Sequence, residues 1–216
     1  MEKLSNNIAN KIASELSLDK DNREVIAYGT FALMQMFLSI FLVFLFGLIF
    51  RVAFEALIIS FSAAILRKYS GGVHASSPGI CTFIGIIVCV GQAVLISLLI
   101  SSVVNLKLII ILGVLIFIWS YYIIYKLAPV DSVAKPIVKE EKRKRMKKGS
   151  IILLSVYLII TVFFILFYIS SGEKKFIFYA LCLYSGILWQ VFTLTASGHL
   201  IVGKVDTFLN HKKKRG

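Results

Sequence analysis

The stretch between residues 67 and 81 gathers the residue types that covalent cleavage of a peptide bond would need. Gly71 and Gly72 are adjacent, and His74 and Cys81 follow within the same short segment. A cysteine attacks a carbonyl carbon as a thiolate, but a free thiol, with a pKa of about 8.5, is mostly protonated at neutral pH. A nearby histidine can take up that proton. The segment therefore suggests a cysteine nucleophile with a histidine base.

A helix that begins inside this segment would favour the reactive form of the cysteine. Ser77 and Pro78 are typical of the N-cap and the first position of a helix, so Cys81 is expected in the first turn. The positive end of the helix dipole stabilises a thiolate there. The N–H groups of that turn and those near the Gly71-Gly72 pair are candidate oxyanion donors. Arg67 could hold a carboxylate of the substrate.

The pairing of histidine and cysteine requires the chain to fold back. On one continuous helix His74 and Cys81 would lie about 10 Å apart, too far for a hydrogen bond. The glycines and Pro78 disfavour a continuous helix, so a fold-back is expected. The spacing alone is also compatible with a solvated loop histidine at the level of the lipid headgroups. Neither a metal nor a cofactor is expected, because the remaining Cys and His residues lack the spacing of zinc ligands.

The elements that would position this segment are apolar helices. Hydrophobic residues make up 58% of the 216 residues and charged residues only 16%, which lies outside the range of soluble domains. Six long apolar segments contain a single charge, Glu55. These segments are 25–50, 52–66, 80–104, 108–125, 150–171 and 176–198. They predict an all-α, polytopic integral membrane protein with about six transmembrane helices. The segment 52–66 is the shortest, about 22 Å as a helix, so whether it crosses fully stays open.

The chain is expected to divide into two parts. In residues 1–24, Leu4, Ile8, Ile12 and Leu16 form one apolar stripe of a helix. This amphipathic helix is expected to lie at the membrane interface, or to pack on the protein's own cytosolic face. Residues 25–216 are expected to form a single membrane domain. It would contain the catalytic loop 67–81, a basic cytoplasmic loop at 126–149 and a basic tail at 204–216, with Gln190 as a candidate for hydrogen bonding between helices.

Basic residues fall mainly on one side of these spans. With six crossings and an inner N-terminus, 20 of the 24 Lys and Arg residues face the cytoplasm and 4 face outside. This distribution predicts a multi-pass protein of the cell membrane with both termini and the catalytic loop in the cytoplasm. The net charge of +13 then serves orientation and contact with anionic lipids, and no nucleic-acid partner is expected.

Several short motifs together resemble a known family. They are Arg67, Gly71-Gly72, His74-Ala75 and Cys81, then Ala128-Pro129-Val130-Asp131 and Lys135-Pro136-Ile137. This combination, with the chain length and the basic central loop, resembles the accessory gene regulator B family. Its members are membrane cysteine endopeptidases that process the precursor of a cyclic quorum-sensing peptide in virulence regulation. The resemblance implies that His74 and Cys81 are the catalytic pair, and that Arg67 and Gly72 match positions tied to activity.

The resemblance also implies a reaction and partners. Cys81 would cleave the C-terminal tail from the precursor through an acyl-enzyme thioester, and the peptide would then close to a thiolactone or lactone. Family precursors have an amphipathic leader and an acidic tail, for which Lys135, Lys139, Lys142 and Arg143 are candidate contacts. Contact with lipid headgroups would explain these charges equally well. The family further suggests a homodimer, and Asp131 could orient His74.

Two other classes of function stay open at this point. A small membrane transporter for peptide export would need polar residues at mid-membrane, and the spans carry almost none. A scaffold that recruits a partner through the basic loop would leave the glycine, histidine and cysteine of segment 67–81 unexplained. A peptidase needs Cys81 specifically, whereas both alternatives should tolerate Cys81→Ser.

Overall fold

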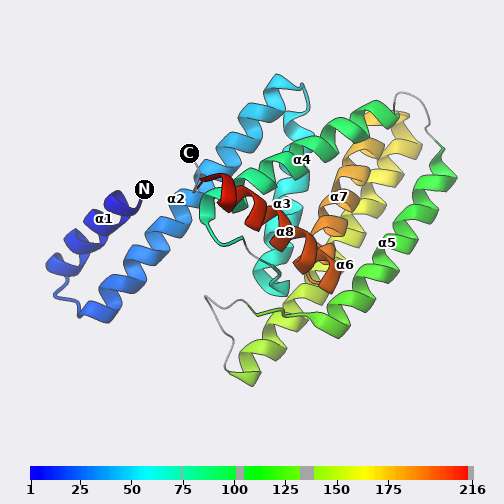
Figure 1. Ribbon diagram of the computed structural model, residues 1–216. Helices are drawn as coiled ribbons and strands as arrows, with labels where there is room; N and C mark the ends of the chain where they lie inside the picture. Colours follow the sequence, from blue (N-terminus) through cyan, green and yellow to red (C-terminus); the bar gives the residue numbers. More distant parts are fainter. Residues whose placement is uncertain (74, 101–104, 132–138, 214–216) are drawn as a thin grey trace. The chain divides into compact units, whose positions relative to one another are not determined.

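The computed structural model describes residues 1–73, 75–100, 105–131 and 139–213, apart from the side chains of residues 100 and 211–213. His74 and Lys135 therefore lie outside the described residues. The described chain forms eight helices (Figure 1). They are α1 (Glu2–Glu15), α2 (Lys20–Ile49), α3 (Ala53–Ser70), α4 (Pro78–Ile100), α5 (Leu106–Leu127), α6 (Glu140–Ser171), α7 (Lys174–Phe192) and α8 (Ala196–Lys213). The prediction of an all-α membrane protein is confirmed.

Five of the described helices, α2, α4, α5, α6 and α7, are long and apolar enough to cross a membrane. The sixth predicted span became α3, which is helical as expected but is not among these five. The reason is its charge: Glu55 lies in its first turn, and Arg67 and Lys68 lie in its last. A crossing by α3 therefore remains a prediction, and so does the side of the membrane on which each terminus lies.

The first of two compact units, Met1–Leu42, contains α1 and most of α2. Small residues of α1 are its buried ones: Ser5, Ala9 and Ala13. The predicted apolar stripe, from Leu4 to Leu16, points outward and is exposed. Arg23 of α2 donates a hydrogen bond to Asn10 of α1 over 3.3 Å, which links the two helices of this hairpin. An outward apolar stripe is what an interfacial helix needs, so that role of α1 stays a prediction.

The second compact unit, Val43–Gly216, is organised around α3 and α7. α7 packs against α3, α4, α5 and α6, and half of its length is buried, more than in any other candidate span. Gly186 of α7 allows a close approach to α3, because a Cβ there would collide with the side chain of Ser62 and the carbonyl of Ile59. The hydroxyl of Tyr157 on α6 donates to the Ser62 carbonyl oxygen over 2.9 Å. α3 is thus an interior helix whose C-terminal end carries Arg67.

Candidate active site

Cys81 lies where the local sequence predicts it. Ser77 Oγ accepts a hydrogen bond from the Ile80 N–H over 3.3 Å, and the Ser77 carbonyl accepts one from the Cys81 N–H over 3.1 Å. Pro78 is the first residue of α4. The cysteine is a half-buried free thiol in the first turn, at the positive end of the helix dipole. The predicted helix start and the place of Cys81 on it are both confirmed.

Arg67 lies beside Cys81. Its Nη2 donates a hydrogen bond to the carbonyl of Val73, so the guanidinium holds the start of the loop. The guanidinium interacts electrostatically with Cys81. The Nε of Arg67 is buried and has no hydrogen-bond partner among the described residues. The structure therefore brings the predicted arginine and the predicted nucleophile together, with one N–H of the arginine unused.

The two glycines are needed because the chain turns sharply between packed neighbours. Gly71 has φ +71° and Gly72 has φ +132°, values that residues with a side chain rarely adopt. A Cβ on Gly71 would collide with the Val130 carbonyl, and one on Gly72 would lie 2.7 Å from Thr193 Oγ1. The Val130 N–H donates to the Ser70 carbonyl over 2.9 Å, in an isolated parallel β-bridge with Gly71. The two motifs of segment 67–81 and of 128–131 are thus in contact.

The C-terminal end of α7 holds the loop from the other side. The amide of Gln190, fully buried, donates to the Gly71 carbonyl over 2.7 Å and to Ser70 Oγ over 3.0 Å. The N–H of Val73 donates to the Thr193 carbonyl over 3.2 Å. The expectation that Gln190 joins helices is confirmed. Its contact with the loop was not predicted, because the partners lie 119 positions apart in the chain.

α8 also reaches this loop. The N–H and the hydroxyl of Ser76 both donate to Asp206 Oδ1, over 3.1 and 3.0 Å. Asn210 Nδ2 donates to Ser76 Oγ over 2.7 Å. Neither acid nor amide was singled out from the sequence, since no local signal connects the basic tail with segment 67–81. Ser76 and Ser77 are therefore both constrained, the first by α8 and the second by the start of α4.

These elements enclose a small cavity at the cysteine. Its volume is about 40 Å³, close to that of one or two water molecules or of a single carbonyl group. Its lining comes from four helices and the loop: Arg67, Val73, Ala75, Cys81, Ile84, Gly85, Trp189, Thr193 and Val202. Trp189, Thr193 and Val202 were missed by the sequence reasoning because they are apolar or weakly polar residues of ordinary helical spacing. Among the described lining residues, Cys81 is the nucleophile and Arg67 the cation that a group entering the cavity would meet.

The basic residues proposed as tail contacts lie elsewhere. Lys139 precedes α6, and Lys142 and Arg143 lie in its exposed N-terminal turns. Arg143 Nη2 forms an ion pair with Asp131 Oδ2 over 2.8 Å, with both side chains partly exposed. Asp131 therefore has a partner other than the histidine, and its predicted orienting role stays a prediction. No group of three or more His, Cys, Asp or Glu that could hold a metal occurs among the described residues.

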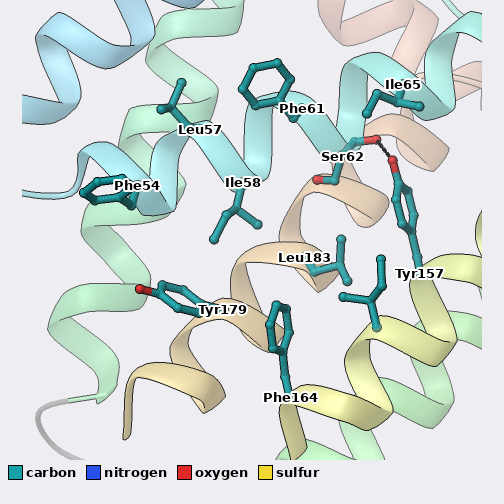
Figure 2. A pocket seen from close by; sticks show the side chains of 11 residues that line it. Phe54, Leu57, Ile58, Phe61, Ser62, Ile65, Tyr157, Phe164, Tyr179 and Leu183 are labelled. Carbon is teal, nitrogen blue, oxygen red and sulfur yellow. Dashed lines mark hydrogen bonds between the residues drawn. The ribbon is translucent and has the colours of Figure 1, made fainter.

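A second hollow is unrelated to the cysteine. It is an apolar groove of about 550 Å³ between α3, α6 and α7 (Figure 2). Phe54 and Phe61 of α3, Phe164 of α6 and Tyr179 of α7 line it, as do Tyr157 and Ser62, which are joined by a hydrogen bond. Among the described residues, none of those singled out for chemistry lines this groove, so it is separate from the cavity at Cys81.

The fold and the site define a class: a multi-pass helical membrane protein with a free cysteine at a helix start, which shares a small cavity with a half-buried arginine. Comparison with known proteins is more specific. The sequence pattern of the family described as accessory gene regulator B matches residues 5–194. An AgrB-like protein 2 of Clostridium perfringens strain 13 is 43% identical over 210 residues, covering 97% of this chain and 98% of the relative. An AgrB-like protein of Clostridium perfringens strain SM101 is 42% identical over the same coverage. No solved structure matches the chain.

This chain belongs to the accessory gene regulator B family. The resemblance read from the motifs is thereby confirmed. Membership connects the protein with peptide processing in quorum sensing and, with its five apolar candidate spans, with a multi-pass place in a membrane.

Proposed function

We propose that this protein is a membrane-embedded cysteine endopeptidase that removes the C-terminal tail of a precursor peptide, with Cys81 as nucleophile and His74 as base. The observation that carries the proposal is the cavity at the start of α4, which Cys81 shares with Arg67. A thiol at a helix start next to a guanidinium is in the surroundings that favour a thiolate. The described residues on either side of position 74 are held in place: Gly71 and Val73 by α7 and α3, and Ser76 by α8.

The proposed reaction has two steps. The Cys81 thiolate attacks the carbonyl carbon at the cleavage site, and the oxyanion that forms is stabilised by Arg67, whose Nε–H has no partner among the described residues. His74 passes its proton to the leaving amine, the peptide C–N bond breaks, and a thioester to Cys81 remains. A cysteine or serine side chain within the bound peptide then attacks the thioester, which frees Cys81 and closes the ring. When a thioester is exchanged for a thiolactone the bond energy is roughly conserved, so the step needs no ATP.

The substrate class follows from charge. A precursor with an acidic tail would meet the exposed basic residues that precede and begin α6: Lys139, Lys142 and Arg143. Because the same residues can bind anionic headgroups, the tail contact requires its own test.

The experiment for the proposed function is co-expression in membranes with a precursor that has an amphipathic leader, a cysteine-containing core and an acidic tail. Release of the tail is measured by mass spectrometry for wild type, Cys81→Ala and His74→Ala. The matched control is Cys89→Ala, which removes a buried free thiol two turns further along α4. Loss of the tail in the first two variants but not in the control supports the proposal. Normal processing by Cys81→Ala would refute the mechanism and favour transport or scaffolding.

A further inference from the structure

One residue of α8 is connected to the loop of the candidate active site by several hydrogen bonds. Asp206 Oδ1 accepts from the backbone N–H of Ser76 and from its hydroxyl, over 3.1 and 3.0 Å. Asn210, one turn further along α8, donates to the same hydroxyl over 2.7 Å and to Asp206 Oδ1 over 3.3 Å. The three side chains form a closed polar triangle, in which Ser76 is the loop's contribution.

The position of Ser76 makes this triangle relevant to catalysis. Ser76 follows residue 74 by two positions and precedes Ser77, the residue that caps α4. Any movement of residue 76 therefore shifts the connection between the proposed base and the helix turn that carries Cys81. The Arg67 side chain and the Thr193 carbonyl hold Val73 at the start of the loop, whereas Asp206 holds Ser76 near its end. The end is the part closer in sequence to the cysteine.

The face of α8 that carries Asp206 also reaches the cavity. Gly198 and Val202 lie eight and four residues before Asp206, so all three occupy one side of the helix. Gly198 and Val202 are buried, and Val202 lines the cavity of Cys81. Gly198 permits this contact, because a Cβ on it would collide with the Phe192 carbonyl at the end of α7. The carboxylate thus acts from a helix whose apolar residues are packed onto the same site.

We infer that Asp206 is a positioning residue of the proposed peptidase: its carboxylate sets the geometry of the segment Ala75–Ser77 and thereby the relative placement of His74 and Cys81. The inference rests on the proposed function. Asp206 is not a cavity-lining residue and makes no contact with Cys81 among the described residues, so it acts through Ser76. Its place on α8 also puts it outside residues 5–194, the part of the chain that the family pattern matches.

The kinetic test uses the full chain in lipid nanodiscs and the precursor described above, with release of the tail as readout. Asp206→Ala is expected to lower kcat about tenfold, since two hydrogen bonds to a charged acceptor are lost at a partly exposed site. KM should stay within about twofold, because the residue does not touch the substrate. Asp206→Asn, whose amide oxygen can still accept both hydrogen bonds, should show a clearly smaller decrease in kcat than Asp206→Ala. Thr207→Ala, which alters the next, exposed residue of α8, is the matched control.

A second measurement does not depend on catalysis. Hydrogen–deuterium exchange of the peptide containing residues 75–81 should be faster in Asp206→Ala than in wild type and in Thr207→Ala, while exchange within α7 stays unchanged. A wild type that releases no tail would refute the proposed function, yet the exchange comparison would still decide whether Asp206 holds the loop. Unchanged exchange, equal losses in Asp206→Asn and Asp206→Ala, or a rise in kcat on removal of the carboxylate would each overturn the inference.

Discussion

At the scale of single residues, the site depends on Arg67, which interacts with both the loop and Cys81. Arg67 binds the Val73 carbonyl and lies in the same cavity as Cys81. A guanidinium carries five N–H donors in a rigid plane, so it can hold the loop and face the thiolate at once. Lysine has the charge without the plane, and it can therefore replace only part of this role.

Arg67→Ala is expected to slow alkylation of Cys81 by iodoacetamide at pH 7 at least threefold, because the thiolate loses its nearest cation. The alkylation rate of Arg67→Lys should lie between the rates of Arg67→Ala and wild type. The rate is measured by mass spectrometry of the peptide that contains Cys81. Lys68→Ala is the control, since the adjacent lysine is exposed and its ammonium lies over the ring of Tyr69 instead. Equal alkylation rates in Arg67→Ala and wild type would show that Arg67 does not raise the reactivity of the Cys81 thiol.

Gly71→Ala is expected to destabilise the fold by about 1–3 kcal/mol, since the backbone at φ +71° and ψ −149° lies in a region that is nearly restricted to glycine. The added methyl group would also collide with the Val130 carbonyl. Thermal unfolding in detergent checks the change. The control is Gly203→Ala on α8, where a Cβ meets no atom within 4 Å and the helix should gain slightly in stability. A Gly71→Ala variant as stable as wild type would contradict the strained-turn account.

At the scale of elements, α7 both packs in the core of the second unit and holds the loop of the candidate active site. It fills the centre of the second unit through residues such as Ile187 and Val191, and its last turns present Gln190 and Thr193 to the loop. The buried polar end of an apolar helix is costly unless each group is paired. The Gln190 NH₂ group and the Thr193 carbonyl find partners in the loop, whereas Gln190 Oε1 is buried without a hydrogen-bond partner among the described residues.

Gln190→Ala should leave the Gly71 carbonyl and Ser70 Oγ without their donor and lower the rate of tail release about tenfold. Circular dichroism should show an unchanged helix content, because the change removes hydrogen bonds and no helix-forming residue. A rate equal to that of wild type would mean that the loop is held well enough by Arg67 and Thr193 alone.

The start of α6 can be tested as a docking element for the acidic tail. Lys139→Glu with Lys142→Glu should raise KM about tenfold for a precursor with an acidic tail, and the effect should shrink at high salt. A precursor with a neutral tail should not respond. The matched double variant is Lys174→Glu with Lys175→Glu, at the start of α7. An equal KM in wild type and in the α6 variant would assign the basic residues to lipid headgroups.

At the scale of the whole molecule, local signals could be read from the sequence and contacts across the chain could not. Ser77 and Pro78 predicted the start of α4, and the glycine pair predicted a break in the helix before it. Both features depend only on residues that are close in sequence. Asp206 and Ser76 lie 130 positions apart, and nothing near either residue indicates the other. The packing of α1 was also not predicted: its small residues are buried, whereas its large apolar residues are exposed.

α3 is the helix whose composition alone does not decide whether it crosses the membrane. α3 has 18 residues, so its length of about 27 Å is close to the thickness of a hydrocarbon core. It packs against α4, α6 and α7, and its buried face includes Ser62 and Ser70, which are shielded from lipid by those helices. A helix surrounded by other helices needs fewer apolar residues than one that faces lipid. The packing of α3 thus supports the crossing that the apolar segment 52–66 predicts.

We therefore expect α3 to cross the membrane and both termini to lie in the cytoplasm. In a variant without native cysteines, a single cysteine in place of Arg51 or Lys107 should react with a membrane-impermeant maleimide on intact cells. Cysteines in place of Lys68, Lys142 or Lys204 should react only after permeabilisation, because basic loops are retained inside. Reaction at both ends of α3, at positions 51 and 68, from outside would show that this helix does not cross. Five crossings would then separate the two termini, and the loop that carries Cys81 would face the exterior.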